Sequence, residues 1–261
     1  MLKLCNGSPG AVMQEIAFPP TVVVIPTYNE IANISRLVPA VLAISPSIRL
    51  LIVDDASSDG TGMEADRLAA ALGRIDVIHR AGKLGLGSAY KQAFQTILRT
   101  AGTEFICQMD ADFSHRPEDL KSMLEAASRG VADIVIGSRW ISGGAVSIWP
   151  FRRLLLSRAG SLYARMLLGI PLYDVTGGLK CWRRKVLESI DLNAVEADGY
   201  AFQIEMSWRS WQHGFSLREV PITFVERADG VSKMSWRVVR EAVVLPWKLR
   251  MRQSANTLQK V

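Results

Sequence analysis

The chain is poor in cysteine and histidine and has no long apolar run. Its 261 residues include 3 cysteines and 3 histidines. No two cysteines have the C-x-x-C spacing, and the histidines show no metal-ligand spacing. This argues against a structural zinc site and favours a reducing, cytosolic compartment. No stretch reaches the roughly 18–20 uncharged apolar residues of a membrane-spanning helix. Because no apolar core follows Lys3, we also expect no signal peptide.

Positive charge and apolar residues are abundant instead. The net charge is +6 and 49% of the residues are apolar, which is enough for one sizeable α/β core. We expect a single domain over residues 19–252, with loose tails at 1–18 and 253–261. The positive charge predicts an anionic partner, which is nucleic acid, a phosphorylated small molecule or an anionic membrane surface.

Short apolar runs alternate with helical patterns through the first half of this domain. The runs predict strands at residues 21–25, 50–53, 75–79, 105–109 and 132–137, and the patterns between them predict helices at 30–43, 64–72, 88–100 and 117–128. Asn29 is expected to cap the first helix. Such alternation predicts an α/β fold with a doubly wound, mainly parallel sheet.

The regular alternation stops after Gly137. We expect a loop at 142–147, an extended segment at 177–182, short strands at 217–220 and 223–225, and helices at 151–168, 200–213 and 235–251, the last bent at Pro246. The helices at 151–168 and 235–251 are basic and amphipathic, with leucine or tryptophan among their arginines. Such helices either pack on the sheet with a solvated face or lie at a membrane interface.

Polar residues follow four of the predicted strands where each strand ends. They are Pro26–Glu30, Asp54–Asp55, His79–Arg80 and Asp110–Asp112. Ligands bind outside the carboxyl ends of parallel strands, so this convergence predicts a site.

The acidic pair Asp110 and Asp112 closes a buried strand. Alternate residues of a strand face one side, and two buried acids are costly unless a cation lies between them. Mg²⁺ or Mn²⁺ carrying a diphosphate meets that need. Taken alone, the short and common Asp-x-Asp motif more often caps a helix or starts a solvated turn.

Five segments in order resemble the dolichyl- and polyprenyl-phosphate mannose synthases, which are inverting, family-2 glycosyltransferases with the GT-A fold. The segments are Val24–Glu30, Val53–Thr61, Lys83–Gly87, Asp110–His115 and Phe224–Lys233. The resemblance implies transfer of mannose from GDP-mannose to a polyprenyl phosphate. It also implies a Mg²⁺ or Mn²⁺ cofactor and peripheral attachment to the cytoplasmic face of a membrane, with an integral-membrane protein as a possible partner.

The resemblance also implies roles at matching positions. Pro26, Tyr28, Glu30, Val53 and Asp55 would hold the base and ribose; Asp110 and Asp112 would bind the metal, with Ala111 giving backbone contact; Arg139, Arg227 and Lys233 would contact phosphates; Arg153 and Ser157 would hold the lipid phosphate. The implied catalytic residues are Asp112, Arg139, Arg227 and Lys233. Ser114 replaces a glutamine of some members, and Glu205 is either near the sugar or on a helix surface.

Three alternatives remain to be compared with this interpretation. A UDP-sugar such as UDP-glucose could replace GDP-mannose as the donor. A nucleic-acid-binding module predicts a basic stripe with interleaved aromatic residues, whereas the predicted sheet edge is acidic, so we expect no nucleic-acid partner. A membrane-associated scaffold without activity would not need the acids of Asp110 and Asp112.

Overall fold

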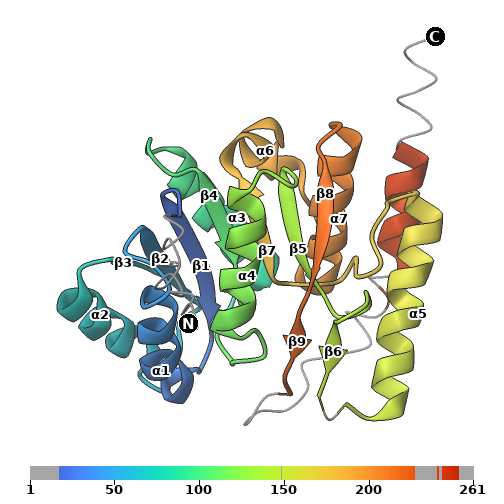
Figure 1. Cartoon of the computed structure of the whole chain (residues 1–261). Helices are drawn as coiled ribbons and strands as arrows, with labels where there is room; N and C mark the ends of the chain where they lie inside the picture. Colours follow the sequence, from blue (N-terminus) through green and yellow to red (C-terminus); the bar gives the residue numbers. More distant parts are fainter. Residues whose placement is uncertain (1–17, 148, 227–239, 241–242, 253–261) are drawn as a thin grey trace, which may run out of the picture.

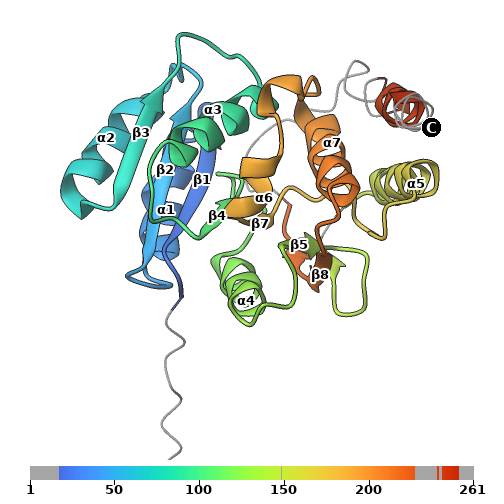
Figure 2. The same ribbon diagram turned by 90° about the horizontal axis from the view of Figure 1, so that it is seen from above.

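Residues 18–147, 149–226, 240 and 243–252 are described by the structure, a computed structural model of the chain. Their main sheet has seven strands in the order β3-β2-β1-β4-β7-β5-β8, and helices cover both of its faces (Figures 1 and 2). The predicted positions Arg227 and Lys233 lie outside the described residues, as do nearly all residues of the two expected tails.

The first half of the domain alternates as the sequence predicts. Its strands are β1 (Thr21–Thr27), β2 (Ile48–Asp54), β3 (Ile75–His79), β4 (Phe105–Gln108) and β5 (Ile134–Ser138), and its helices are α1 (Ile31–Leu42), α2 (Thr61–Leu72), α3 (Leu86–Leu98) and α4 (Pro117–Ser128). β1 pairs in parallel with β2 and β4, and β2 pairs in parallel with β3. The carboxyl ends of these four strands therefore lie at one edge, and the α/β, mainly parallel prediction is confirmed.

The second half inserts one reversed strand into this sheet. Its elements are β6 (Ala145–Val146), α5 (Phe151–Leu168), β7 (Lys180–Arg183), α6 (Arg184–Ser189), the 3₁₀ turn η1 (Leu192–Ala194), α7 (Gly199–Gln212), β8 (Leu217–Pro221) and β9 (Thr223–Phe224). β7 is antiparallel to both β4 and β5, while β5 pairs in parallel with β8. β6 and β9 form a second, two-stranded sheet, so the loop expected at 142–147 contains a short strand.

Asn29 does not cap α1, contrary to the prediction. The helix follows Glu30, and Asn29 has a left-handed backbone with φ of 57°. Its side-chain oxygen accepts the N–H of Ser58 at 2.9 Å, and its own N–H donates to Ser57 Oγ. Asn29 therefore ties the loop after β1 to the loop after β2, which a local capping rule does not anticipate.

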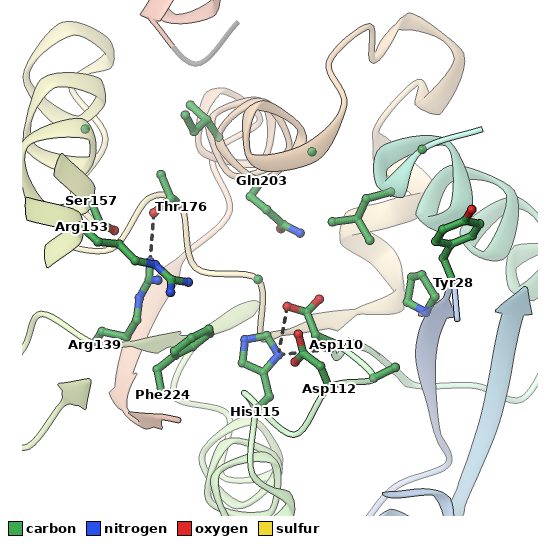
Figure 3. A pocket seen from close by; sticks show the side chains of 18 of the residues that line it. Tyr28, Asp110, Asp112, His115, Arg139, Arg153, Ser157, Thr176, Gln203 and Phe224 are labelled. Carbon is green, nitrogen blue, oxygen red and sulfur yellow. Dashed lines mark hydrogen bonds and ion pairs between the residues drawn. The ribbon is translucent and has the colours of Figure 1, made fainter. Parts of the chain in front are cut away.

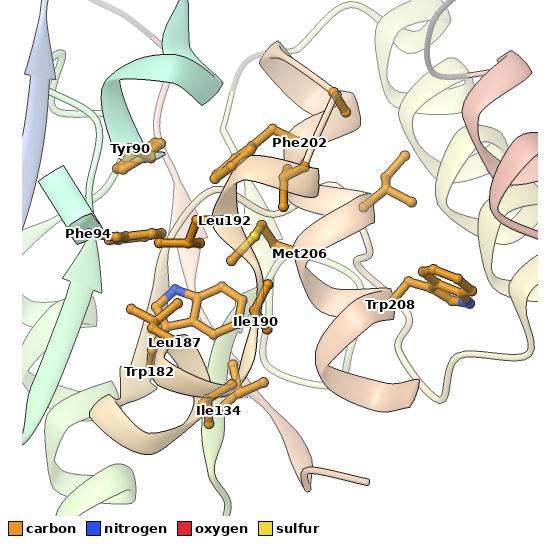
Figure 4. Close-up of a cluster of buried hydrophobic side chains, with 14 of the residues drawn as sticks. Tyr90, Phe94, Ile134, Trp182, Leu187, Ile190, Leu192, Phe202, Met206 and Trp208 are labelled. Carbon is orange, nitrogen blue, oxygen red and sulfur yellow. The ribbon is translucent and has the colours of Figure 1, made fainter. Parts of the chain in front are cut away.

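Two apolar cores lie on opposite faces of the sheet. One packs β-strand side chains against α1, α2 and α4, and the other packs them against α3, α6 and α7. In the second core Trp182, Tyr90 and Phe202 are fully buried (Figure 4). Fully burying a large apolar side chain contributes roughly 1.5–3 kcal/mol, and the short segments α6 and η1 supply Leu187 and Leu192 to this core.

α5 lies beside the helical residues 243–252 at one end of the sheet (Figures 1 and 2). The hydroxyl of Tyr163 donates to the carbonyl oxygen of Val243 at 2.8 Å and joins the two helices. α5 has the predicted bounds, whereas residues 235–239 and 241–242 of the helix predicted at 235–251 lie outside the described residues. Among the residues described, no helix has both the length and the apolar character needed to cross a membrane.

Candidate active site

A cavity of about 470 Å³ opens at the carboxyl ends of β1, β2 and β4. Its walls come from the loops after these strands, from α5 and from α7, with side chains converging from all of them (Figure 3). The predicted site residues that line it are Pro26, Tyr28, Glu30, Asp55, Asp110, Ala111, Asp112, Arg139, Arg153 and Ser157. These ten residues come from the ends of β1, β2, β4 and β5 and from α5. They share one cavity, and their roles stay predictions.

Val53 differs from the other predicted positions. Its side chain is fully buried in the core beneath α3, and it does not line the cavity. Ser114, the position of a glutamine in some members of the family, is likewise fully buried. It does not line the cavity beside Asp110 and Asp112, where a third side-chain ligand would lie.

Asp110 and Asp112 lie in a turn after β4 and not on the strand itself, which ends at Gln108. The alternation of a strand therefore does not orient them, contrary to the expectation. The turn does so instead: Ser114 N–H donates to Asp112 Oδ1 at 3.0 Å, and Phe113 between them has a left-handed φ of 58°. Asp112 is only 5% exposed.

His115 is a cavity residue that sequence reasoning missed. Its Nδ1 accepts the N–H of Asp110 at 3.1 Å, so the proton of the neutral ring lies on Nε2. The ring is buried and packs edge-to-face on Phe224, with centroids 5.6 Å apart. His115 thus fixes the turn that carries Asp110 and Asp112 (Figure 3). This supporting role leaves no spacing pattern in the sequence.

The donor set of this turn fits a hard divalent cation bound together with a diphosphate. In the described part of the chain, no group of three or more His, Cys, Asp or Glu side chains is placed to hold a metal alone. Mg²⁺ characteristically takes one or two carboxylates and completes its shell with substrate phosphates and water. The negative charge of the turn also affects Tyr90. Burial is the larger cause that raises the pKa of the Tyr90 hydroxyl, and the charges of Asp110 and Asp112 raise it further.

The wall near Tyr28 is built around the carboxylate of Asp55. Arg80, buried beside it, donates to Asp55 Oδ1 at 2.5 Å, and Gly85 N–H donates to Oδ2 at 3.2 Å. Lys83, in the same loop, places Nζ 3.8 Å from the centroid of the Tyr28 ring. The loop 82–87 is therefore held against the predicted base-binding side of the cavity.

Gly85 lets this loop approach α7 closely. A Cβ there would lie 1.9 Å from Asp198 Oδ2, and the glycine has a φ of +99°. The Asp198 carboxylate caps α7 through Gly199 N–H and also accepts the N–H of Gly87. The paired glycines thus serve packing between α3 and α7.

Arg139 is held by a buried partner, Asp174, that sequence reasoning missed. Its Nε and Nη2 each lie 2.7 Å from a different oxygen of Asp174, and Nη2 also donates to Thr176 Oγ1 at 3.0 Å. Arg139 is 6% exposed and Asp174 is fully buried. Glu219 fixes the Asp174 backbone by accepting its N–H at 2.8 Å. The guanidinium therefore faces the cavity in one fixed orientation.

Arg153 on α5 is stacked on an aromatic side chain. Its guanidinium lies 4.0 Å from the ring centroid of Trp149, and Nη1 lies 2.8 Å from an oxygen of Glu226. Phe224 packs edge-to-face with Trp149, with centroids 5.3 Å apart. This cation–π packing orders the α5 end of the cavity, which lies opposite the acidic turn (Figure 3).

Glu205 has neither of its expected positions. Its side chain is fully buried and does not line the cavity. It accepts the N–H of Ala197 at 3.0 Å and a hydrogen bond from Arg209. Glu205 therefore holds the segment just before α7 against that helix. Gln203 and Ile204 are the α7 side chains that line the cavity wall in the described part of the chain.

A sheet of this order with acids at its carboxyl edge defines a nucleotide-sugar transferase of the GT-A class. The sequence pattern of glycosyl transferase family 2 matches residues 22–191, and the chain belongs to that family.

Named relatives are similar over most of the chain. Polyprenol monophosphomannose synthase of Mycolicibacterium smegmatis is 50% identical over 235 residues, covering 89% of this chain and 88% of that protein. Undecaprenyl-phosphate mannosyltransferase of Micrococcus luteus is 47% identical over 221 residues, covering 85% and 90%.

Solved structures share the fold at low identity. Glucosyl-3-phosphoglycerate synthase from Mycobacterium tuberculosis, in complex with Mn²⁺, UDP and glucosyl-3-phosphoglycerate, superimposes with a TM-score of 0.62 at 20% identity, covering 89% of this chain and 80% of that one. The mannosyltransferase PcManGT from Pyrobaculum calidifontis, in complex with GDP-Man and Mn²⁺, gives 0.59 at 19% identity, covering 94% and 68%. The predicted GT-A fold is confirmed.

Proposed function

We propose that this protein transfers mannose from GDP-mannose to a polyprenyl phosphate, releasing GDP with inversion at the anomeric carbon. The observation that carries the proposal is the single cavity joining Asp110 and Asp112 to Arg153 and Ser157. The names of the two relatives at 50% and 47% identity support the sugar and the lipid acceptor. The GDP-Man complex of PcManGT supports the nucleotide.

The donor nucleotide lies along the Tyr28 side of the cavity in this proposal. Pro26 lies near the end of β1, Tyr28 and Glu30 follow that strand, and Asp55 follows β2, so together they receive the base and ribose. Asp110 and Asp112 hold a Mg²⁺ or Mn²⁺ ion, which supplies electrostatic stabilisation to the diphosphate leaving group when bound. Arg227 and Lys233 keep their predicted phosphate contacts as part of this proposal.

The acceptor phosphate lies at the other end, near Arg153 and Ser157. Its second pKa of about 6 leaves it largely dianionic at neutral pH. One phosphate oxygen attacks the anomeric carbon, and the bond from that carbon to the diphosphate oxygen breaks, its electron pair leaving with GDP. No proton has to be removed, so the site needs no general base, and positioning by Arg139 and Arg153 supplies much of the rate.

α5 also presents an apolar stripe to the surroundings. Phe151, Leu155, Leu162 and Met166 are 74%, 58%, 52% and 70% exposed. Their spacing places them on one face of the helix, and Trp247, in the helical segment beside α5, is 54% exposed. The same helix contributes Arg153, Ser157 and Tyr163 to the cavity. This supports peripheral attachment to the cytoplasmic face of a membrane, from which the lipid phosphate enters beside α5.

Sugar transfer to a polyprenyl phosphate in vesicles tests this function. We expect a mannolipid from GDP-mannose with Mg²⁺ or Mn²⁺, and none after EDTA treatment. Product from UDP-glucose in place of GDP-mannose would overturn the donor while leaving the reaction class intact. Absence of lipid product from every nucleotide sugar would overturn the function itself.

A further inference from the structure

Gln203 lines the cavity and carries a buried side-chain oxygen, Oε1, without a hydrogen-bond partner among the described residues. The residue is 2% exposed and lines the cavity from α7 (Figure 3). Among the residues that the structure describes, no group donates a hydrogen bond to its Oε1 atom. Buried side-chain acceptors are nearly always satisfied, so an unpaired oxygen in a residue that lines a cavity points to a ligand that brings a donor.

The position of Gln203 indicates which part of the substrate it meets. Its side chain lies between the acidic turn of Asp110 and Asp112 on one side and Arg153 with Ser157 on the other (Figure 3). The proposed function puts the diphosphate at the first end and the acceptor phosphate at the second. The sugar ring has to lie between them for the attack to occur, and Gln203 faces that middle region.

The chemistry of the unsatisfied atom agrees with this position. Phosphate and diphosphate oxygens are acceptors at neutral pH, so they offer no donor to Oε1. A sugar hydroxyl both donates and accepts, and the amide of a glutamine matches it with one carbonyl oxygen and one NH₂ group. A neutral amide also adds no charge beside the acidic turn.

The helix that carries Gln203 is fixed from below by a buried lysine. Lys180 Nζ donates to the backbone oxygen of Gln203 at 2.7 Å and to Ser207 Oγ at 2.7 Å. Lys180 is fully buried in β7. The backbone of Gln203 is therefore anchored to the central sheet. A side chain that recognises a substrate hydroxyl requires such a fixed backbone position.

We propose that Gln203 determines the specificity for the donor sugar by accepting a hydrogen bond from one hydroxyl of its ring. This inference rests on the proposed function and adds a recognition residue that neither the motifs nor the resemblance assigns. A site that pairs a buried polar group with a substrate hydroxyl discriminates strongly against a donor that lacks it, because the protein group is then left unpaired.

Gln203→Met tests the proposal because methionine has a similar length and fills the same space without a hydrogen-bonding group. We expect kcat/KM for mannosyl transfer to fall about 10- to 100-fold, with GDP affinity in the presence of Mn²⁺ within about twofold of the wild type. Gln212→Met is the matched control, since Gln212 is exposed at the end of the same helix. It should behave as the wild type does.

Donor analogues that each lack one ring hydroxyl sharpen the test. For one analogue, wild-type protein should lose about as much kcat/KM as Gln203→Met loses with GDP-mannose, and the variant should lose nothing further. Equal transfer by Gln203→Met and wild type, or parallel losses of GDP and GDP-mannose affinity, would overturn the inference alone. Wild-type protein that makes no mannolipid would overturn the proposed function and, with it, this inference.

Discussion

The buried pair of Arg139 and Asp174 gives the most demanding test of the site geometry. Asp174 is fully buried and binds Arg139 through both carboxylate oxygens, each at 2.7 Å. Asp174→Asn keeps the size of the side chain but removes its charge and turns one acceptor into a donor that faces the guanidinium. Arg139 then loses a buried counter-charge and the bidentate contact that orients it.

The expected cost follows from burial. Breaking a buried ion pair by removing one partner costs about 3–5 kcal/mol, whereas exposed pairs contribute about 0–1 kcal/mol. We therefore expect Asp174→Asn to lower the free energy of unfolding by about 3 kcal/mol or more. Asp76→Asn is the matched control, because its pair with Arg49 is 65% and 50% exposed, and it should change stability by less than about 1 kcal/mol.

Urea unfolding monitored by tryptophan fluorescence measures this difference. A second comparison uses the double variant Arg139→Met with Asp174→Leu, which replaces the pair by apolar side chains and should recover much of the lost stability. The reasoning would be refuted if Asp174→Asn cost no more than Asp76→Asn. Transfer activity should be lost in both Asp174→Asn and the double variant, since each removes the oriented guanidinium from the cavity.

Four further predictions address the metal, the acceptor, a buried lysine and the membrane. Asp112→Ala should abolish transfer, whereas full activity of the wild type in metal-free buffer would contradict the role of the acidic turn. Arg153→Ala should raise KM for the lipid phosphate about 10-fold or more with little change in GDP-mannose affinity, measured by steady-state kinetics and calorimetry; equal loss of both would contradict an acceptor role. Burial lowers the pKa of Lys180 to about 7 from 10.5, so between these pH values the unfolded chain binds a proton that the folded chain does not. The free energy of unfolding of the wild type, relative to Lys180→Met, should therefore rise with pH across that window by on the order of 4 kcal/mol; a flat difference would contradict it. Met166→Ser should weaken sedimentation with anionic vesicles several-fold, whereas Met63→Ser, at an equally exposed methionine on α2, should not, and equal binding by both would argue against α5 as the membrane contact.

The alternating fold could be predicted because each strand and helix leaves a local pattern. The β-branched run at 21–25 and the apolar run at 105–109 correspond to β1 and β4, and the polar residues after them meet at one edge as parallel pairing requires. The reversed direction of β7 leaves no such pattern, because it depends on pairing with strands distant in the chain, as in the register of Cys107 with Cys181 and of Val135 with Cys181.

The residues that sequence reasoning missed act through contacts distant in the chain. Asp174 orients Arg139 through an ion pair that forms only in the folded protein. Gln203 lines the cavity because α7 lies beside it. His115 has no metal-ligand spacing in the sequence, yet it supports the acidic turn by accepting the backbone N–H of Asp110. Local spacing thus found the acids, whereas the groups that orient the site required the fold.

The most direct test of the proposed reaction is a competition in one vessel. Wild-type protein is incubated with vesicles containing polyprenyl phosphate, Mn²⁺, GDP-mannose carrying ¹³C in the sugar and unlabelled UDP-glucose, and the lipid is analysed by mass spectrometry. The account predicts a hexosyl phospholipid that carries the ¹³C label, with one GDP released per lipid formed. An unlabelled hexosyl lipid, or free labelled mannose without lipid product, would contradict it.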